Sequence, residues 1–197
     1  MVAVLDWGMW SERPYFVCEM VGARLLDLIH ARGPMDELES LRLVEQIADV
    51  VASVHDRGYV LQAVDANCVG SHPRDAGWML DWPAFNAKIG SKSPRGRRYI
   101  SPFTAPEIET ASTFAAASDV FALGSLLAFA LTGSTDLAGV ARSARIATHT
   151  TAASRALISA LTHANPKERP TAAEARDRAA TIRERLEPIS GSRPWLT

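Results

Sequence analysis

The densest group of chemically active side chains is a basic segment that also carries hydroxyl groups. Five cations fall within eleven residues, and hydroxyl residues lie in or beside the same stretch: Lys88, Lys92, Arg95, Arg97 and Arg98, with Ser91, Ser93, Ser101 and Thr104. A phosphoryl group added here would find guanidinium partners. Gly90, Pro94 and Gly96 interrupt the segment, which predicts an exposed loop. The loop is either simply solvated or a docking site for acidic or phosphorylated partners.

Other patterns that support catalysis are sparse. Cys18 and Cys68 form no CxxC or Cys/His motif, and the five histidines show no spacing typical of zinc or of a nucleophile's base. Asp75 and Asp81 have no carboxylate partner at a spacing that favours general acid–base chemistry. We therefore expect two free thiols in a reducing compartment.

The overall composition predicts one domain with a sizeable core. The chain has 197 residues, of which 47% are hydrophobic and 22% charged. A net charge of -1 gives no general attraction to nucleic acid or anionic membrane. The longest apolar stretch, residues 120–131, is shorter than the ~20 residues that span a bilayer. The N-terminus lacks the pattern of a signal peptide, so a cytoplasmic protein is expected.

Local patterns predict an α+β fold that is mainly α. Residues 2–5 and 15–18 are β-prone and predict a hairpin, with Gly8 and residues 11–14 between the strands. A short helix is expected over residues 23–31. Asp36, with Glu39 three residues later, predicts a capping box for a helix that extends to Gly58. Its apolar positions recur at helical spacing: Leu41, Val44, Ile47, Val51 and Val54.

The second half of the sequence predicts further helices. Residues 60–61 and 78–80 are strand-like pieces in a loop region, and Ser118 or Asp119 opens an apolar core helix that ends at Gly133. Residues 133–148 are ambiguous, whereas residues 151–163 are helical. Thr171 and Glu174 form a capping box that opens a helix to about residue 186. The tail, residues 188–197, is expected to be loose.

Six short motifs, in order along nearly the whole chain, resemble the C-terminal lobe of a bacterial Ser/Thr protein kinase. Residues 15–21 resemble the fifth strand and the hinge, with Cys18 as gatekeeper, and residues 54–60 resemble the approach to the catalytic loop. Leu80-Asp81-Trp82-Pro83 stands where the family has Asp-Phe-Gly, and Thr104-Ala105-Pro106-Glu107 matches its Ala-Pro-Glu motif. Residues 118–124 match the start of the central helix, and residues 165–171 match the Asp-Pro-x-x-Arg-Pro run. The resemblance implies a remnant of the N-terminal lobe with the hinge over residues 1–21, a helical C-lobe over residues 22–187, a tail over residues 188–197, and an N-terminal lobe that is largely missing.

Positions that hold such a lobe together are retained. The resemblance implies a buried ion pair between Glu107 and Arg169, and loss of one partner of such a pair typically costs ~3–5 kcal/mol. It also implies that Asp119 accepts backbone hydrogen bonds from the catalytic loop. We interpret all three residues as structural.

Positions that would carry phosphoryl transfer are mostly replaced. Leu61, Gln62 and Ala63 stand where the family has His-Arg-Asp, and an alanine cannot accept the proton of an attacking hydroxyl. Asp65 replaces a lysine that contacts phosphate, and would repel phosphate instead. Cys68 takes the place of the metal-binding Asn, although a one-residue shift would bring Asn67 into that role. The glycine-rich loop and the lysine strand have no counterpart.

A nucleotide site is accordingly not expected, although two remnants remain. Asp81 is either a weak magnesium ligand or a structural remnant, since magnesium usually combines one or two carboxylates with phosphate oxygens. Pro83 would restrict the backbone that moves Asp81. If ATP binds at all, the backbone of Glu19 and Val21 at the hinge would hold the adenine. We expect no cofactor, with ATP and magnesium as the alternative.

The leading hypothesis is a pseudokinase-like C-lobe that acts as a binding or regulatory module in signalling. Its expected partner is a protein: another kinase, a phosphoprotein or the missing N-terminal lobe. No nucleic acid and no membrane span are expected. The alternatives are an active Ser/Thr kinase whose gene model starts too late, a nucleotide binder without transfer activity, and a decaying gene fragment. Trp7 and Trp10 either pack within the hairpin or form an exposed interface patch.

Overall fold

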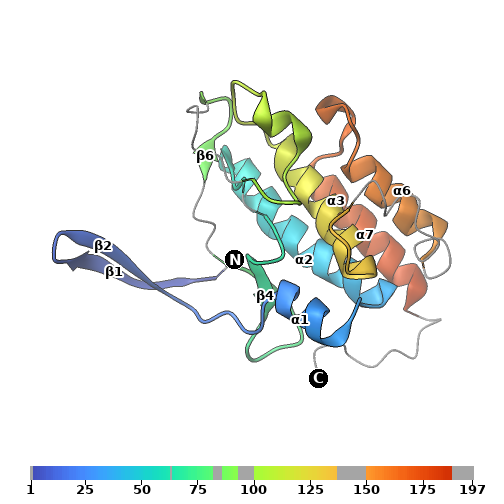
Figure 1. Ribbon diagram of the computed structural model, residues 1–197, viewed down its shortest axis with the longest axis horizontal. Helices are drawn as coiled ribbons and strands as arrows, with labels where there is room; N and C mark the ends of the chain where they lie inside the picture. The colour runs from blue at the N-terminus through green and yellow to red at the C-terminus, as the bar shows by residue number, and fades with distance from the viewer. Residues whose placement is uncertain (1, 63, 82–85, 93–99, 137–149, 188–197) are drawn as a thin grey trace.

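The structure is a computed structural model that describes residues 2–62, 64–81, 86–92, 100–136 and 150–187. These residues form an α+β protein that is mainly helical, as predicted, with five α-helices and three two-stranded sheets among them. Figure 1 shows the helices packed side by side and a long hairpin that projects away from them. The expectations for Ala63, Pro83, Ser93, Arg95, Arg97, Arg98, residues 137–149 and the tail fall outside the described residues.

The hairpin consists of β1 (Val4–Trp10) and β2 (Arg13–Cys18), which pair antiparallel. The predicted strands were too short, because Gly8 and Pro14 lie inside strands rather than in the turn. Ser11 and Glu12 make the turn with φ values of 47° and 64°. Positive φ at both central residues gives the twist that a two-residue hairpin turn needs. Serine and glutamate are not the residue types that usually indicate such a turn in a sequence.

Helices α1 (Leu25–Arg32) and α2 (Glu37–Asp56) begin and end close to the predicted residues. The Asp36 carboxylate caps α2 by accepting the N–H of Glu39 at 2.8 Å. The expected capping box is only half formed, because the Glu39 carboxylate accepts a hydrogen bond from the Trp78 indole instead. The predicted apolar face is buried, with four side chains fully covered: Leu41, Val44, Ile47 and Val51.

Two small ladders follow α2. Strand β3 (Tyr59–Val60) pairs with β6 (Ala87–Lys88), and β4 (Val69–Ser71) pairs with β5 (Trp78–Leu80). Both pairs are antiparallel. The strand over residues 78–80 is confirmed, and the one expected at residues 60–61 lies one residue earlier. These ladders fix both ends of the loop between β3 and β4.

The remaining helices surround a buried central one. Helix α3 (Ala117–Thr132) is covered from residue 118 to 131 and ends at Gly133 with φ 70°. Helices α6 (Ala152–Leu161) and α7 (Ala172–Leu186) follow, and the predicted capping box of Thr171 and Glu174 opens α7. Short 3-10 helices lie at Pro106–Glu109 (η1) and Pro166–Glu168 (η2). In the described parts of the chain, no helix combines the length and the apolarity that a bilayer crossing requires.

Gly124 lets α3 and α6 approach closely. A Cβ atom at this position would lie 2.7 Å from Cβ of Leu161 and 2.7 Å from Cγ2 of Thr162. Such separations are shorter than van der Waals contact, and the close-packed interior leaves little room for adjustment.

We predict that Gly124→Ala lowers the free energy of unfolding by about 1–3 kcal/mol through overpacking. This loss outweighs the ~1 kcal/mol that alanine gains over glycine in a helix. Urea denaturation followed by circular dichroism measures it. Gly77→Ala is the control, since its added Cβ would meet its nearest neighbour at 3.6 Å. A Gly124→Ala protein as stable as the unmodified one would contradict the packing argument.

Candidate functional site

The carboxylate of Asp119 organises the loop between β3 and β4. It lies in the first turn of α3 and is 1% exposed. Its oxygens accept the backbone N–H groups of Leu61 and Gln62, both at 2.8 Å. His55 of α2 places its Nε2 2.9 Å from the same carboxylate. Because an ionised carboxylate only accepts, His55 carries its proton on Nε2 here. His55 lies within residues 54–60, and no spacing rule in the sequence connects it to Asp119.

The hydrogen bond from its backbone N–H to Asp119 holds Gln62 in an unusual backbone conformation. Its φ is 60°, in the left-handed region that residues other than glycine rarely adopt. Its backbone N–H is fixed by Asp119 at 2.8 Å, so the surrounding structure determines this geometry. Leu61 beside it is buried. Leu61 and Gln62 therefore have a well-defined backbone and offer an apolar and an amide side chain.

Asp65 caps the following turn and does not face a phosphate site. It is fully buried, and its Oδ1 accepts the N–H groups of Asn67 at 2.8 Å and Cys68 at 3.2 Å. Burial and these two hydrogen bonds direct Oδ1 into its own turn. A short side chain that bonds to backbone two or three residues ahead is typical of a turn. Asn67, in contrast, is exposed.

Cys68 presents a neutral thiol. Burial contributes most to raising the pKa of the Cys68 thiol to about 12; the charge and hydrogen bond of Asp65 and the charge of Asp81 act in the same direction, and Arg24 opposes them. The thiolate is the nucleophilic and metal-binding form of cysteine. At neutral pH Cys68 therefore presents a protonated, half-buried sulfur.

Asp81 already has a cation beside it. It follows β5, and its carboxylate lies 2.5 Å from Nη2 of Arg24. Both side chains are about one third exposed. A metal ion bound by Asp81 would have to compete with this guanidinium. Sequence reasoning missed Arg24, because no spacing rule connects two residues 57 positions apart. Among the described residues, no cluster of three or more His, Cys, Asp or Glu side chains could hold a metal ion.

The hinge residues are partly engaged within the chain. The N–H of Glu19 donates to the carbonyl of Ala3 at 2.8 Å, and its carboxylate lies 3.4 Å from Nη2 of Arg74. The Val21 side chain lies so close to Gly70 that a Cβ there would come within 2.4 Å of Cγ1. The Glu19 N–H is therefore not free to donate to an adenine ring in this conformation.

Arg169 and Glu107 form a two-point ion pair. The distances are 2.6 Å for Nη1–Oε1 and 2.9 Å for Nη2–Oε2. The Arg169 side chain is fully buried, and it also donates to the carbonyls of His163 and Ala117. Its guanidinium stands 4.9 Å from the ring centroid of Phe121. One cation thus connects η1, α3 and the segment before α7.

Of the basic segment, the structure describes residues 88–92, and the description resumes at residue 100. Lys88 lies on β6, and Lys92 forms an isolated bridge with Thr113. Ser91 donates its hydroxyl to the carbonyl of Lys88 at 2.6 Å, and Thr104 accepts the N–H of Ser101 at 2.9 Å. These hydroxyl groups already serve local turns.

Comparison with known proteins gives a distant, partial similarity to a protein kinase. The chain is 28% identical over 141 residues to the serine/threonine-protein kinase PknB of Mycobacterium leprae, which covers 68% of this chain and 23% of that protein. No protein-family model matches the chain. The chain thus matches less than a quarter of its relative's length. The relation is kinase-like at the level of the family, and it leaves activity to experiment.

We predict that Glu107→Ala destabilises the fold by about 3 kcal/mol, because it leaves a fully buried guanidinium without its carboxylate. Thermal and urea unfolding measure the change. Asp49→Ala is a matched control that removes the acid from an exposed arginine pair, that of Arg176. Exposed pairs contribute little, so the control should unfold near the unmodified protein. Equal losses of unfolding free energy in the two variants would show that the buried ion pair stabilises the fold no more than the exposed one does.

We also predict that Cys68 resists alkylation in the folded protein. In a Cys18→Ser background, iodoacetamide at pH 8 should modify Cys68 at least tenfold more slowly than in urea, as measured by mass spectrometry. The raised pKa keeps the thiol protonated up to about pH 12, and half-burial restricts access. Asp65→Asn removes one negative charge and should accelerate the reaction. Rapid labelling of folded protein at pH 8 would refute the assigned protonation state.

Proposed function

We propose that this chain is a kinase-like C-terminal lobe that serves as a protein-binding or regulatory module without phosphotransfer activity. The observation that carries the proposal is a contrast within one loop. Asp119 holds the backbone of Leu61 and Gln62, while the next residue in the sequence is Ala63, where the family has its catalytic base. The framework of a catalytic loop is kept, and the group that would accept a proton is absent from the sequence.

Three further features support this proposal. Arg24 neutralises Asp81, the carboxylate that would bind magnesium. Cys68 offers a protonated thiol in place of an amide ligand. Asp65 stands where the resemblance places a lysine that contacts phosphate, and its carboxylate accepts hydrogen bonds within its own loop. This position therefore offers no cation to a phosphate. Phosphoryl transfer depends on metal and cationic side chains to neutralise the phosphates, and each of these positions has a different task here.

The expected partner is another protein, of a signalling kind: a kinase, a phosphoprotein or a chain that supplies an N-terminal lobe. An active Ser/Thr kinase within a longer protein and a nucleotide binder without transfer are the competing functions. Neither is favoured by the site, because the Glu19 N–H is engaged by Ala3 and Asp81 by Arg24.

We predict no transfer of labelled γ-phosphate from ATP to a generic Ser/Thr substrate with magnesium or manganese. We also predict a negligible thermal shift with Mg-ATP, since ligand binding to the folded state would raise its stability. A kinase of known activity and a denatured sample of this chain are the controls. Transfer that disappears in Asp81→Ala would overturn the proposal. A shift of several degrees without transfer would favour the nucleotide binder.

A further inference from the structure

A groove lies between α6 and α7, on the side of the molecule away from the hairpin (Figure 1). It holds about 340 Å³, at the small end of the range of ligand sites. Ala153 and Ala156 are three residues apart and share one face of α6, where their methyl groups leave the space open. Leu157 of α6 and Ile182 of α7 complete the apolar lining, beside Thr181. We call this hollow the α6–α7 groove.

Helix α7 supplies little apolar cover of its own. The side chains that it buries are all alanines, at positions 172, 175 and 179. Ile182 packs against the core but is only partly buried. Apolar surface gains free energy when it is covered, so the α6–α7 groove is a place where a further apolar side chain would stabilise the fold.

The ten residues after Glu187 lie outside the described residues, and their sequence suits this groove. Pro188 directly follows the C-cap residue Glu187, at a position where proline commonly follows the end of a helix. Gly191 lies between two serines and gives a flexible stretch that can reverse direction. Trp195 follows as a large aromatic side chain, and residues 188–197 contain no acidic residue.

The tail is long enough to reach back. Ile182 lies four residues before Leu186, the last residue of α7, which corresponds to ~6 Å along the helix axis. Trp195 lies nine residues beyond Leu186, and an extended chain of that length covers ~30 Å. The chain can therefore turn at residues 188–192 and still bring the indole to the groove.

We propose that residues 188–197 fold back along α7 and that the Trp195 side chain fills the α6–α7 groove. The groove is also lined by Asp177 and Arg178, so Arg193 meets one carboxylate and one guanidinium there. These charges oppose each other, and the apolar contact of the indole supplies the attraction. The proposal is independent of the kinase-like function, because it uses only α6, α7 and the residues that follow them.

The size of the groove favours a tethered occupant over a separate protein. One tryptophan side chain buries ~150–250 Å², whereas each partner in an interface of standard size buries ~800 Å². A short flexible tether gives an effective concentration of ~1 mM or more. A contact too weak to hold a separate chain is therefore populated when its two halves belong to one chain.

Hydrogen exchange of the full chain, followed by mass spectrometry, tests the proposal. Trp195→Ser should raise amide exchange in residues 152–157 and 180–187 at least about threefold, because a docked tail suppresses local opening of the helices that it covers. Ala156→Lys introduces a long charged side chain at an exposed position of the groove and should have the same effect. The double variant should exchange no faster than either single variant, since both changes remove one shared contact.

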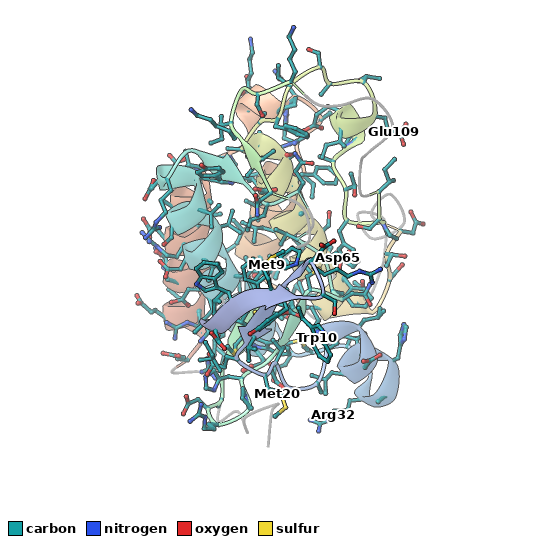
Figure 2. All side chains as sticks on the ribbon, turned by 90° about the vertical axis from the view of Figure 1, so that its left-hand side faces the viewer. Met9, Trp10, Met20, Arg32, Asp65 and Glu109 are labelled. Carbon is teal, nitrogen blue, oxygen red and sulfur yellow. The ribbon has the colours of Figure 1, made fainter. Side chains whose placement is uncertain are left out.

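Each substitution has a matched control. Trp10→Ser removes a tryptophan that is 75% exposed on the hairpin, where Figure 2 labels it, on the opposite side of the molecule from α6 in Figure 1. Ser159→Lys adds the same charge at an exposed position of α6 that does not line the groove. Neither control should raise exchange in α6 or α7. Circular dichroism melting checks that every variant folds.

Three results would overturn the proposal. One is unchanged exchange in α6 and α7 of Trp195→Ser. Another is a double variant in which the two increases add, because two additive effects would have separate causes. The third is protection of the groove that is lost on dilution of the unmodified protein, which would assign the groove to the tail of a second copy.

Discussion

The buried carboxylate of Asp119 is the contact that connects the central helix to everything that resembles an active site. A buried charge is costly unless it is well hydrogen-bonded, and this one meets Leu61, Gln62 and His55. Its place in the first turn of α3 adds the favourable field of a helix N-terminus. The positive φ of Gln62 exists because this anchor compensates for it. The loop conformation is thus a property of α3 as much as of the loop itself.

A second buried contact at the start of α3 is the ion pair between Arg169 and Glu107. Arg169 is fully buried and satisfies its guanidinium with the Glu107 carboxylate and two carbonyls. The Asp119 hydrogen bonds and the Arg169–Glu107 ion pair both hold non-helical segments against the apolar helix α3. They require a folded lobe but no bound nucleotide. This explains how the framework can persist while the reacting positions take other side chains, since the residues that stabilise the fold and those that would react are different sets.

The candidate site and the hairpin have opposite characters. At the site, Arg24 meets Asp81, Asp65 bonds to its own turn, and Cys68 keeps its proton, so the charges are compensated within the chain. The hairpin exposes its apolar side chains instead. A surface that is satisfied internally has little free energy to gain from a ligand, whereas exposed apolar area gains by being covered. Exposed apolar area therefore lies on the hairpin, whereas the polar groups of the loop are paired within the chain.

The sequence by itself determined what depends on neighbours along the chain. The cap at Asp36, the capping box at Thr171 and the apolar repeat of α2 are local, so the helices of the fold were predictable. The identity of residue 63 as alanine, on which the proposed lack of transfer depends, is likewise a matter of sequence alone. The hairpin was predicted with residues 11–14 between its strands, but its tight two-residue turn was not, because Ser11 and Glu12 lack the usual turn signature.

Only the tertiary structure decided which distant groups meet. Glu39 had the spacing to complete a capping box, but the Trp78 indole, 39 residues away, took its carboxylate. The sequence left Asp81 either a weak metal ligand or a structural remnant, and the fold places Arg24 beside its carboxylate. Asp65 had the position of a phosphate contact, yet its burial turned it into a cap. Hydrogen bonds and ion pairs depend on distances of a few ångströms, and for residues far apart in the chain only packing sets those distances.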